Sequence, residues 1–167
     1  VERINLIVQQ LLDFAKPAPP KLIPLDVPRL LDETLELLNG ELVHRHVQVQ
    51  RYYKGSERVL GDPQQLKQVF INLVLNSLQA VNGEARLDIR TVVEGSSLSV
   101  TIADNGCGIA PKDLPHVFEP FYTTKATGTG LGLAVAQGIV TEHGGQIAVE
   151  SQMGRGTRLV LHFPIAT

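Results

Sequence analysis

Apolar residues recur every three to four positions in four segments, the spacing of one helix face. Residues 1–15 place six on one stripe: Ile4, Ile7, Val8, Leu11, Leu12 and Ala15. A second helix is predicted after Asp26, with Asn39–Gly40 as its stop signal and a buried face of Leu30, Leu31, Thr34, Leu35 and Leu38. Two more are predicted over residues 62–81 and 131–143. Since a helix as short as 1–15 is marginal alone in water, its stripe needs a partner.

Between these helices, apolar and polar residues alternate with the period of two that is typical of strands. Residues 85–93 and 98–103 are predicted to form one hairpin, and residues 146–150 and 158–163 a second. Shorter strands are predicted over residues 47–53 and 59–60. Helices packed on one face of a mixed, mostly antiparallel sheet are the economical arrangement, so we expect an α+β fold of two layers.

The run Lys16–Pro20 (KPAPP) is predicted to end the first helix, because proline cannot continue one. It suggests a boundary between an interaction helix (residues 1–16), a linker (17–25) and the main domain (26–167). The chain begins at Val1 without an initiator methionine, so we expect a fragment of a longer protein.

The helix predicted over residues 62–81 has the clearest start in the chain. Asp62 suits the N-cap, Pro63 the first helical position, and Gln65 the position where a capping box takes Glu or Gln. Its apolar circumference is predicted to be Leu66, Val69, Phe70, Leu73, Val74 and Leu78. One sector carries amides: Gln65, Gln68, Asn72, Asn76 and Gln79. Taken alone, this sector favours an ordinary solvent face, while amide oxygens aimed at Mg²⁺ are the alternative.

Two glycine clusters bracket a long segment with little periodicity. Asp104–Gly108 (DNGCG) follows a predicted strand, so Asp104 can accept a hydrogen bond from an exocyclic amine, although the composition also suits a plain turn. Gly128–Gly132 (GTGLG) opens a helix, whose amides can hold an anion. It is neither a dinucleotide fingerprint nor a P-loop. Lys125 lies just upstream, where it can meet a phosphate or remain a solvated charge.

Composition narrows the function classes. A formal net charge of −2 gives no reason to expect binding to nucleic acid or to an anionic membrane. The one cysteine, Cys107, excludes a disulfide framework within the chain and a site of several cysteines. No apolar run reaches the length of a membrane span and no signal-peptide pattern is present, so we expect a cytoplasmic domain.

In combination these motifs resemble the ATP-binding catalytic domain of sensor histidine kinases, within the gyrase, Hsp90, histidine kinase and MutL superfamily. Four runs are similar to its N, G1, F and G2 boxes: Asn72–Ser77, Asp104–Ile109, Phe118–Phe121 and Gly128–Leu133, with a closing Gly154-x-Gly156-Thr157. The resemblance covers residues 26–163. The run Phe121–Lys125 and the ending Ser77–Ala80 look closest to the nitrogen-regulation sensor kinases.

The resemblance implies a sandwich that binds ATP with Mg²⁺. Asp104 would bind the adenine amine, with Thr157 near the same edge. Asn76 would be the main Mg²⁺ ligand and Asn72 would support the metal or phosphates; with Lys125, these form the implied catalytic set. The other implied nucleotide contacts are Gly106, Gly108, Ile109, Gly128, Thr129, Gly130, Leu131 and Gly132. The segment between the two glycine clusters, residues 109–127, would be a lid over the nucleotide. Phe118 and Phe121 would anchor this lid by packing.

The chain departs from the family at Gln79 and Ala80, where many relatives carry a lysine and an aromatic residue. That puts two nucleotide contacts in doubt and places more of the phosphate binding on Lys125. The chain has five histidines: His44, His46, His116, His143 and His162. None of them stands in the sequence context of the family's acceptor histidine. His143 suits a helix C-terminus instead. Residues 1–16 resemble the end of the second helix of the dimerisation hairpin, so we expect the acceptor histidine outside this chain.

The resemblance implies as partners that hairpin, a response regulator of the nitrogen-regulator type, and a second copy of the full-length protein. Three rival interpretations remain. An ATPase or ATP-driven clamp of the superfamily carries glutamate where this chain has Asn72. A non-catalytic nucleotide-binding module conflicts with the intact boxes. An anti-sigma-factor serine kinase is disfavoured by the F box and the first helix.

Overall fold

The computed structural model describes residues 2–15, 18–126 and 128–167. Its helices are α1 (Glu2–Ala15), α2 (Val27–Leu37), α3 (Asn39–His44), α4 (Pro63–Ala80) and α5 (Gly132–Glu142), with a single 3₁₀ turn at Leu114–His116. Its strands are β1 (Ile23–Leu25), β2 (Gln48–Tyr53), β3 (Val59–Gly61), β4 (Arg86–Glu94), β5 (Ser97–Asp104), β6 (Gln146–Gln152) and β7 (Gly156–Pro164). The first helix was predicted to start at Val1 and to end at Lys16–Pro17, and these three residues lie outside the described part of the chain.

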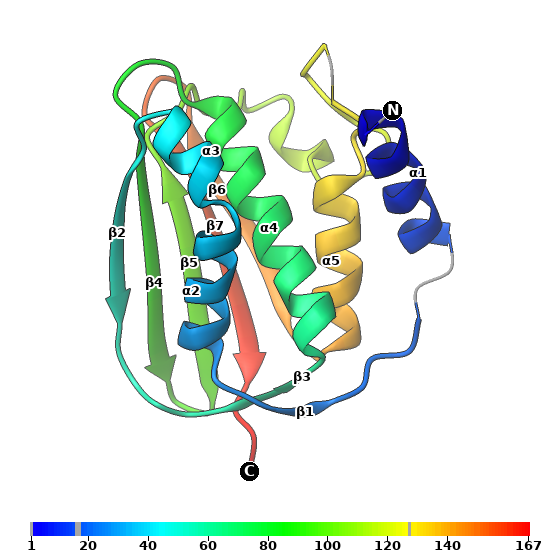
Figure 1. The fold of residues 1–167 in the computed structure, drawn as a ribbon, viewed down its shortest axis with the longest axis vertical. Coiled ribbons are helices and arrows are strands. Elements are labelled where there is room, and N and C mark those ends of the chain that lie inside the picture. Colours follow the sequence, from blue (N-terminus) through cyan, green and yellow to red (C-terminus); the bar gives the residue numbers. More distant parts are fainter. Residues whose placement is uncertain (1, 16–17, 127) are drawn as a thin grey trace.

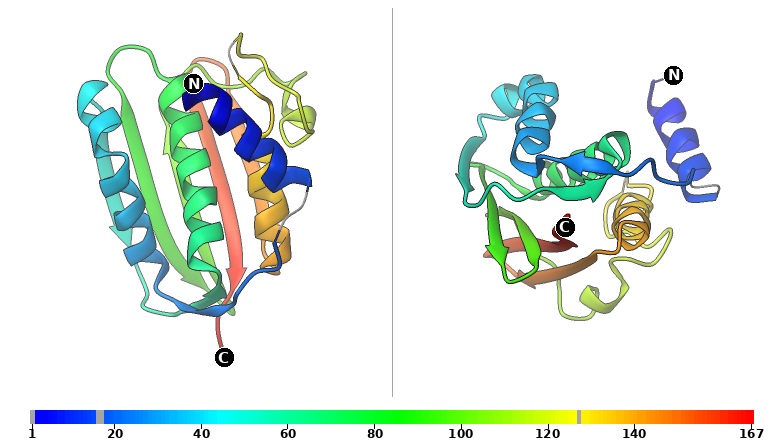
Figure 2. Two further views of the ribbon diagram at one scale, coloured as in Figure 1. Left: turned by 45° about the vertical axis from the view of Figure 1, so that its right-hand side comes forward. Right: turned by 90° about the horizontal axis from the view of Figure 1, so that it is seen from below.

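The main sheet has the order β2-β4-β5-β7-β6. Strand β2 runs parallel to β4, and the other neighbours are antiparallel. Helices α2, α4 and α5 cover one face of this sheet, while α1 lies outside them beside α5 (Figures 1 and 2). The predicted α+β sandwich and both predicted hairpins are confirmed. In the described chain, no helix combines the length and apolar character needed to cross a membrane.

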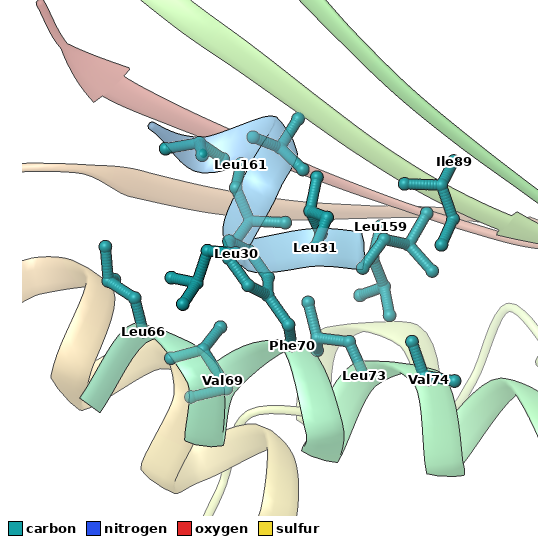
Figure 3. Packing of buried hydrophobic residues seen from close by; sticks show 14 of the residues in the cluster. Leu30, Leu31, Leu66, Val69, Phe70, Leu73, Val74, Ile89, Leu159 and Leu161 are labelled. Atoms are coloured by element: carbon teal, nitrogen blue, oxygen red, sulfur yellow. The ribbon is translucent and has the colours of Figure 1, made fainter. Parts of the chain in front are cut away.

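The core lies between the helix layer and the sheet. All six apolar side chains predicted for the inner circumference of α4 are buried. They meet Leu30 and Leu31 of α2 and the sheet residues Ile89, Leu159 and Leu161 (Figure 3). Because this apolar face fixes the rotation of α4, its amide sector is turned away from the core, at the side where α5 and the lid lie.

The start of α4 is tied to two distant segments. Asp62 Oδ1 accepts hydrogen bonds from the N–H groups of Gln64 (3.0 Å) and Gln65 (3.1 Å), which confirms the cap. Its Oδ2 accepts the N–H of Lys21 at 2.9 Å. The capping box also predicts a return hydrogen bond between the Gln65 side chain and the Asp62 N–H, and this part of the prediction is wrong. The Gln65 amide donates to the Ala18 carbonyl, and the Asp62 N–H donates to His143 Nε2 at 2.9 Å.

Two further expectations differ from the structure. The second helix ends next to Asn39–Gly40 as expected, at Leu37 with Leu38 as its C-cap, but the chain then begins the unpredicted helix α3 at Asn39. Residues 23–25, expected in a linker, form β1 and pair with β3. The apolar stripe of α1 stays largely exposed: the relative exposure of Ile4 is 65% and that of Leu12 is 55%.

Candidate functional site

A cavity of about 400 Å³ lies where α4, the end of β5, the lid and the start of α5 meet. Its volume is in the range of small-molecule sites. Most of the residues implied by the motifs line it: Asn72, Asn76, Asp104, Gly108, Ile109, Lys125, Gly128, Thr129, Gly130, Gly132 and Thr157. A larger opening of about 640 Å³ between α2, α3 and β2 contains none of them.

Asp104 stands at the last position of β5, with its carboxylate held by main-chain donors. Oδ1 accepts the N–H of Gly106 at 2.8 Å and the N–H of Thr157 at 3.3 Å. Burial raises the pKa of this carboxyl above its ordinary value, and these hydrogen bonds oppose the rise. Since both main-chain bonds go to Oδ1, Oδ2 keeps acceptor capacity for a ligand.

Gly156 is required at this point of the site. Its φ is +116°, and a Cβ there would lie 2.0 Å from the Asp104 carbonyl oxygen. Only glycine therefore lets β7 begin directly against the end of β5. The neighbouring Thr157 hydroxyl lies 2.9 Å from that of Ser151, whose oxygen in turn accepts the Ile109 N–H at 2.7 Å. This network ties the loop after Asp104 to the last hairpin.

Lys125 reaches from the lid to α4. Its ammonium donates to Asn76 Oδ1 at 2.7 Å and to Gln79 Oε1 at 3.0 Å. Burial lowers the pKa of Lys125, and the nearby Cys107 and Asp104 oppose that shift. Asn72 uses its amide differently, because its Nδ2 donates to the Gly132 carbonyl at 3.3 Å. Helix α4 is thus joined to the lid through Lys125 and to the start of α5 through Gly132.

The start of α5 opens on the cavity through Gly130, Gly132 and Leu133. Gly130 has a φ of +71°, and a Cβ on it would lie 2.4 Å from the Phe121 carbonyl carbon. The close approach allows the Phe121 N–H to donate to the Gly130 carbonyl at 2.9 Å. Because the first amides of a helix have no intrahelical acceptor, this end of the cavity suits an anion such as a phosphate.

The opposite wall suits a hard cation. Oxygen atoms of Asn76 and Gln79 already surround a positive charge, the Lys125 ammonium, and amide oxygens are ligands that Mg²⁺ accepts. Within the described residues, no group of three His, Cys, Asp or Glu side chains is arranged to hold a metal. A divalent cation here would therefore depend on amide oxygens and on ligand phosphates.

Two implied residues lie beside the cavity and not in its lining. Gly106 packs against the end of α4, since a Cβ there would lie 2.5 Å from the Ala80 carbonyl oxygen. Leu131 is buried, with 1% relative exposure, where α5 begins. Several lining residues were not among the implied nucleotide contacts: Leu75, Cys107, Asp113, Val117, Tyr122, Thr123, Thr124 and Leu133. Five of them lie in the lid between the two glycine clusters, which has no periodicity from which to predict an inward face.

Phe121 does not anchor the lid by burial in the core. Its relative exposure is 60%, and its ring meets that of Phe14 of α1 edge-on, with centroids 6.4 Å apart. The expected packing role therefore involves α1 and not the sheet. Farther along the lid, the Tyr122 hydroxyl donates a hydrogen bond to the Asp113 carboxylate.

Comparison with known proteins gives a consistent grouping. Residues 61–167 match the family model described as "Histidine kinase-, DNA gyrase B-, and HSP90-like ATPase". The chain is 36% identical over 165 residues to the sensor histidine kinase ZraS of Escherichia coli (strain K12), covering 98% of this chain and 36% of ZraS. It is 38% identical over 166 residues to sporulation kinase A of Bacillus subtilis (strain 168), covering 98% of this chain and 27% of that kinase.

Among solved structures, the catalytic domain of histidine kinase ThkA in a nucleotide-free form superposes with a TM-score of 0.79 at 27% identity. The match covers 86% of this chain and 95% of the ThkA domain. The chain thus spans about a third of the two full-length relatives and nearly all of an isolated catalytic domain.

Proposed function

This chain belongs to the family of histidine kinase-, DNA gyrase B- and HSP90-like ATPases, as a catalytic domain of the sensor histidine kinase kind, and we propose that it binds ATP with Mg²⁺ and transfers the γ-phosphoryl group to a histidine outside residues 1–167. The observation that carries the proposal is the single cavity in which Asp104, Asn76, Lys125 and the start of α5 meet. The cavity offers an acceptor for the adenine amine, oxygen ligands for a cation, and a site for phosphate.

Each wall of the cavity has a distinct task. Asp104 Oδ2 accepts the adenine amine, with Thr157 beside it. The amides at the start of α5, with Gly128, Thr129 and Gly130, would hold phosphate oxygens. Asn76 holds Mg²⁺, with Asn72 beside it, and the cation neutralises phosphate charge. Lys125 supplies a further positive charge to the terminal phosphate. The chain's contribution is positioning and electrostatic stabilisation, with no covalent intermediate on its own residues.

ATP hydrolysis is the rival activity of the family, and the amide side chain of Asn72 disfavours it. Its Nδ2 is engaged with the Gly132 carbonyl, and an amide cannot take a proton from an attacking water as a carboxylate can. Phosphoryl transfer to an acceptor side chain is therefore favoured over hydrolysis.

The organisation of the parent protein follows from the same proposal. Residues 1–16 end the second helix of the dimerisation hairpin and residues 26–167 form the catalytic domain. Residues 17–25 connect the two, and the last three of them are held against the catalytic domain as β1. The exposed apolar stripe of α1 supports this, because such a face requires packing partners of the kind a dimeric bundle supplies. We place the full-length protein as a homodimer with its kinase domain in the cytoplasm. The run Phe121–Lys125 favours a response regulator of the nitrogen-regulator type as partner.

The test supplies the parent's histidine-bearing hairpin as a separate chain, with this domain and γ-labelled ATP. We expect label on the hairpin, dependence on Mg²⁺, and none retained by residues 1–167 alone. Asn76→Ala should abolish the transfer without unfolding the domain, as checked by circular dichroism. Label on His44, His46, His116, His143 or His162 of this chain, or phosphate release without transfer, would contradict the proposal.

A further inference from the structure

The contact between the lid and α4 defines a point where two amide oxygens converge. Asn76 and Gln79 are three residues apart on α4, so their side chains are neighbours on one face of the helix. The Lys125 ammonium lies 2.7 Å from Asn76 Oδ1 and 3.0 Å from Gln79 Oε1. An ammonium group donates only, so both amides must present their oxygen atoms to this point.

This arrangement explains what Gln79 does in place of a charged side chain. A lysine at position 79 would set a second ammonium against that of Lys125, which would be repelled from Asn76. Glutamine instead adds an oxygen to the one that Asn76 supplies. The pair is neutral, so its affinity for a cation depends on the negative charge of a bound phosphate chain.

We propose that Gln79 acts with Asn76 as a ligand of the divalent cation that accompanies the nucleotide, and that the Lys125 ammonium occupies this same point until nucleotide and cation arrive. The inference rests on the proposed function and deepens it. Two cations cannot share the point, because their repulsion is strong in a partly buried site. Cation binding therefore releases Lys125, and with it the second half of the lid, toward the phosphates.

The first test measures by calorimetry the affinity of the domain for a non-hydrolysable ATP analogue, in Mg²⁺ and in EDTA. The ratio of the two affinities is the gain due to the cation. We expect Gln79→Leu to lower this gain about tenfold and to leave the EDTA affinity within about twofold, since one of two protein ligands is lost. Gln79→Glu, which keeps an oxygen ligand, should retain or increase the gain.

Gln64→Leu is the matched control, because Gln64 is exposed at the other end of the same helix, away from the cavity. Its gain should equal that of the unmodified chain. An unchanged gain in Gln79→Leu would overturn the role of Gln79 while leaving the proposed function intact. No nucleotide binding by the unmodified chain would instead overturn the proposed function.

The second test observes lysine side-chain ammonium groups by proton–nitrogen NMR without nucleotide. Hydrogen bonds to two oxygens should slow proton exchange of Lys125 enough to give a signal, which Lys125→Met identifies by its loss. We expect that signal to broaden in Gln79→Leu, to persist in Gln64→Leu, and to shift when Mg²⁺ and the analogue are added. A Lys125 signal indifferent to Gln79→Leu or to Mg²⁺ would refute the shared site.

Discussion

At the scale of single residues, Asp104 combines a ligand role with a cost to the fold. Its Oδ1 accepts two main-chain N–H groups while Oδ2 keeps acceptor capacity for a base, and the residue is half-buried. Asp104→Asn keeps an acceptor at Oδ1 and replaces the second oxygen with a donor, which faces the donor of adenine. Since a hydrogen bond to a charged group contributes about 1.5–3 kcal/mol, ATP affinity should fall about 10- to 100-fold by calorimetry.

The same substitution should make the unliganded domain more stable near pH 7. Burial raises the folded-state pKa of Asp104 above its unfolded value, so the charged carboxylate destabilises the fold once the pH exceeds the folded pKa. Asparagine removes that charge. The gain in Tm should shrink as the pH falls through the folded pKa of Asp104, where the carboxyl is protonated. An Asn variant less stable than the unmodified chain at pH 7 would show that the carboxylate supports the loop.

The sequence indicated Asp104, Asn76 and Lys125 separately, each with a plain alternative interpretation. Their association depends on contacts between distant parts of the chain, such as that between Asn76 and Lys125, which are 49 positions apart. Gln79 was visible as a member of the amide sector and as a departure from the family pattern. Its contact with Lys125 was beyond sequence reasoning, because a lid without periodicity gives no indication of which side chain points inward.

At the scale of elements, the start of α4 is the best supported junction in the helix layer. Burial raises the pKa of Asp62, but hydrogen bonds from the N–H groups of Lys21, Gln65 and Gln64 outweigh it and leave the pKa lowered. Asp62→Ala should cost about 1 kcal/mol of unfolding free energy, the usual effect of losing an N-cap, as measured by urea denaturation.

Asp62→Asn separates the acceptor from the charge, because asparagine caps as well as aspartate. At pH 7 it should lose much less stability than Asp62→Ala. A lowered folded pKa means that the stabilisation by Asp62 is present above its unfolded pKa and is lost as the pH falls through the folded one. The Asn variant should therefore lose less stability than the unmodified chain between neutral and acidic pH. Parallel pH profiles for the two chains would contradict this assignment.

Elements with a long apolar period were predictable, and short ones set by tertiary pairing were not. Helix α4 has a full inner face and a clear cap, so both its bounds and its rotation followed from the sequence. Strand β1 has three residues, two of them exposed at Ile23 and Pro24, and gains its hydrogen bonds only from β3. Helix α3 begins at Asn39, where local propensity indicates a stop, and its buried Leu42 joins the core.

At the scale of the whole molecule, α1, the lid and α5 form one contiguous flank. Helix α1 packs beside α5, and Phe14 near its end meets Phe121 of the lid (Figure 1). Phe121 has a φ of +67°, unusual for a bulky residue, and its N–H is bonded to Gly130. We therefore expect a change in the position of α1 to alter the contact between Phe121 and Gly130, at the end of the cavity proposed to bind phosphate.

We expect nucleotide to slow amide hydrogen exchange in the lid but not in the central strand of the sheet. The lid has short-range turn hydrogen bonds, such as that from Gly128 N–H to the Lys125 carbonyl at 3.2 Å, whereas β5 is paired on both sides in the middle of the sheet, with β4 and β7. ATP with Mg²⁺ should slow exchange across residues 116–129 and leave β5 unchanged, because ligand contacts order the lid. Phe14→Ala should speed exchange around Phe121 without nucleotide, since an aromatic pair contributes about 0.5–1.5 kcal/mol. Leu37→Ala, at an exposed position on α2, is the control. Equal lid exchange with and without ATP would mean that this segment does not close over the nucleotide.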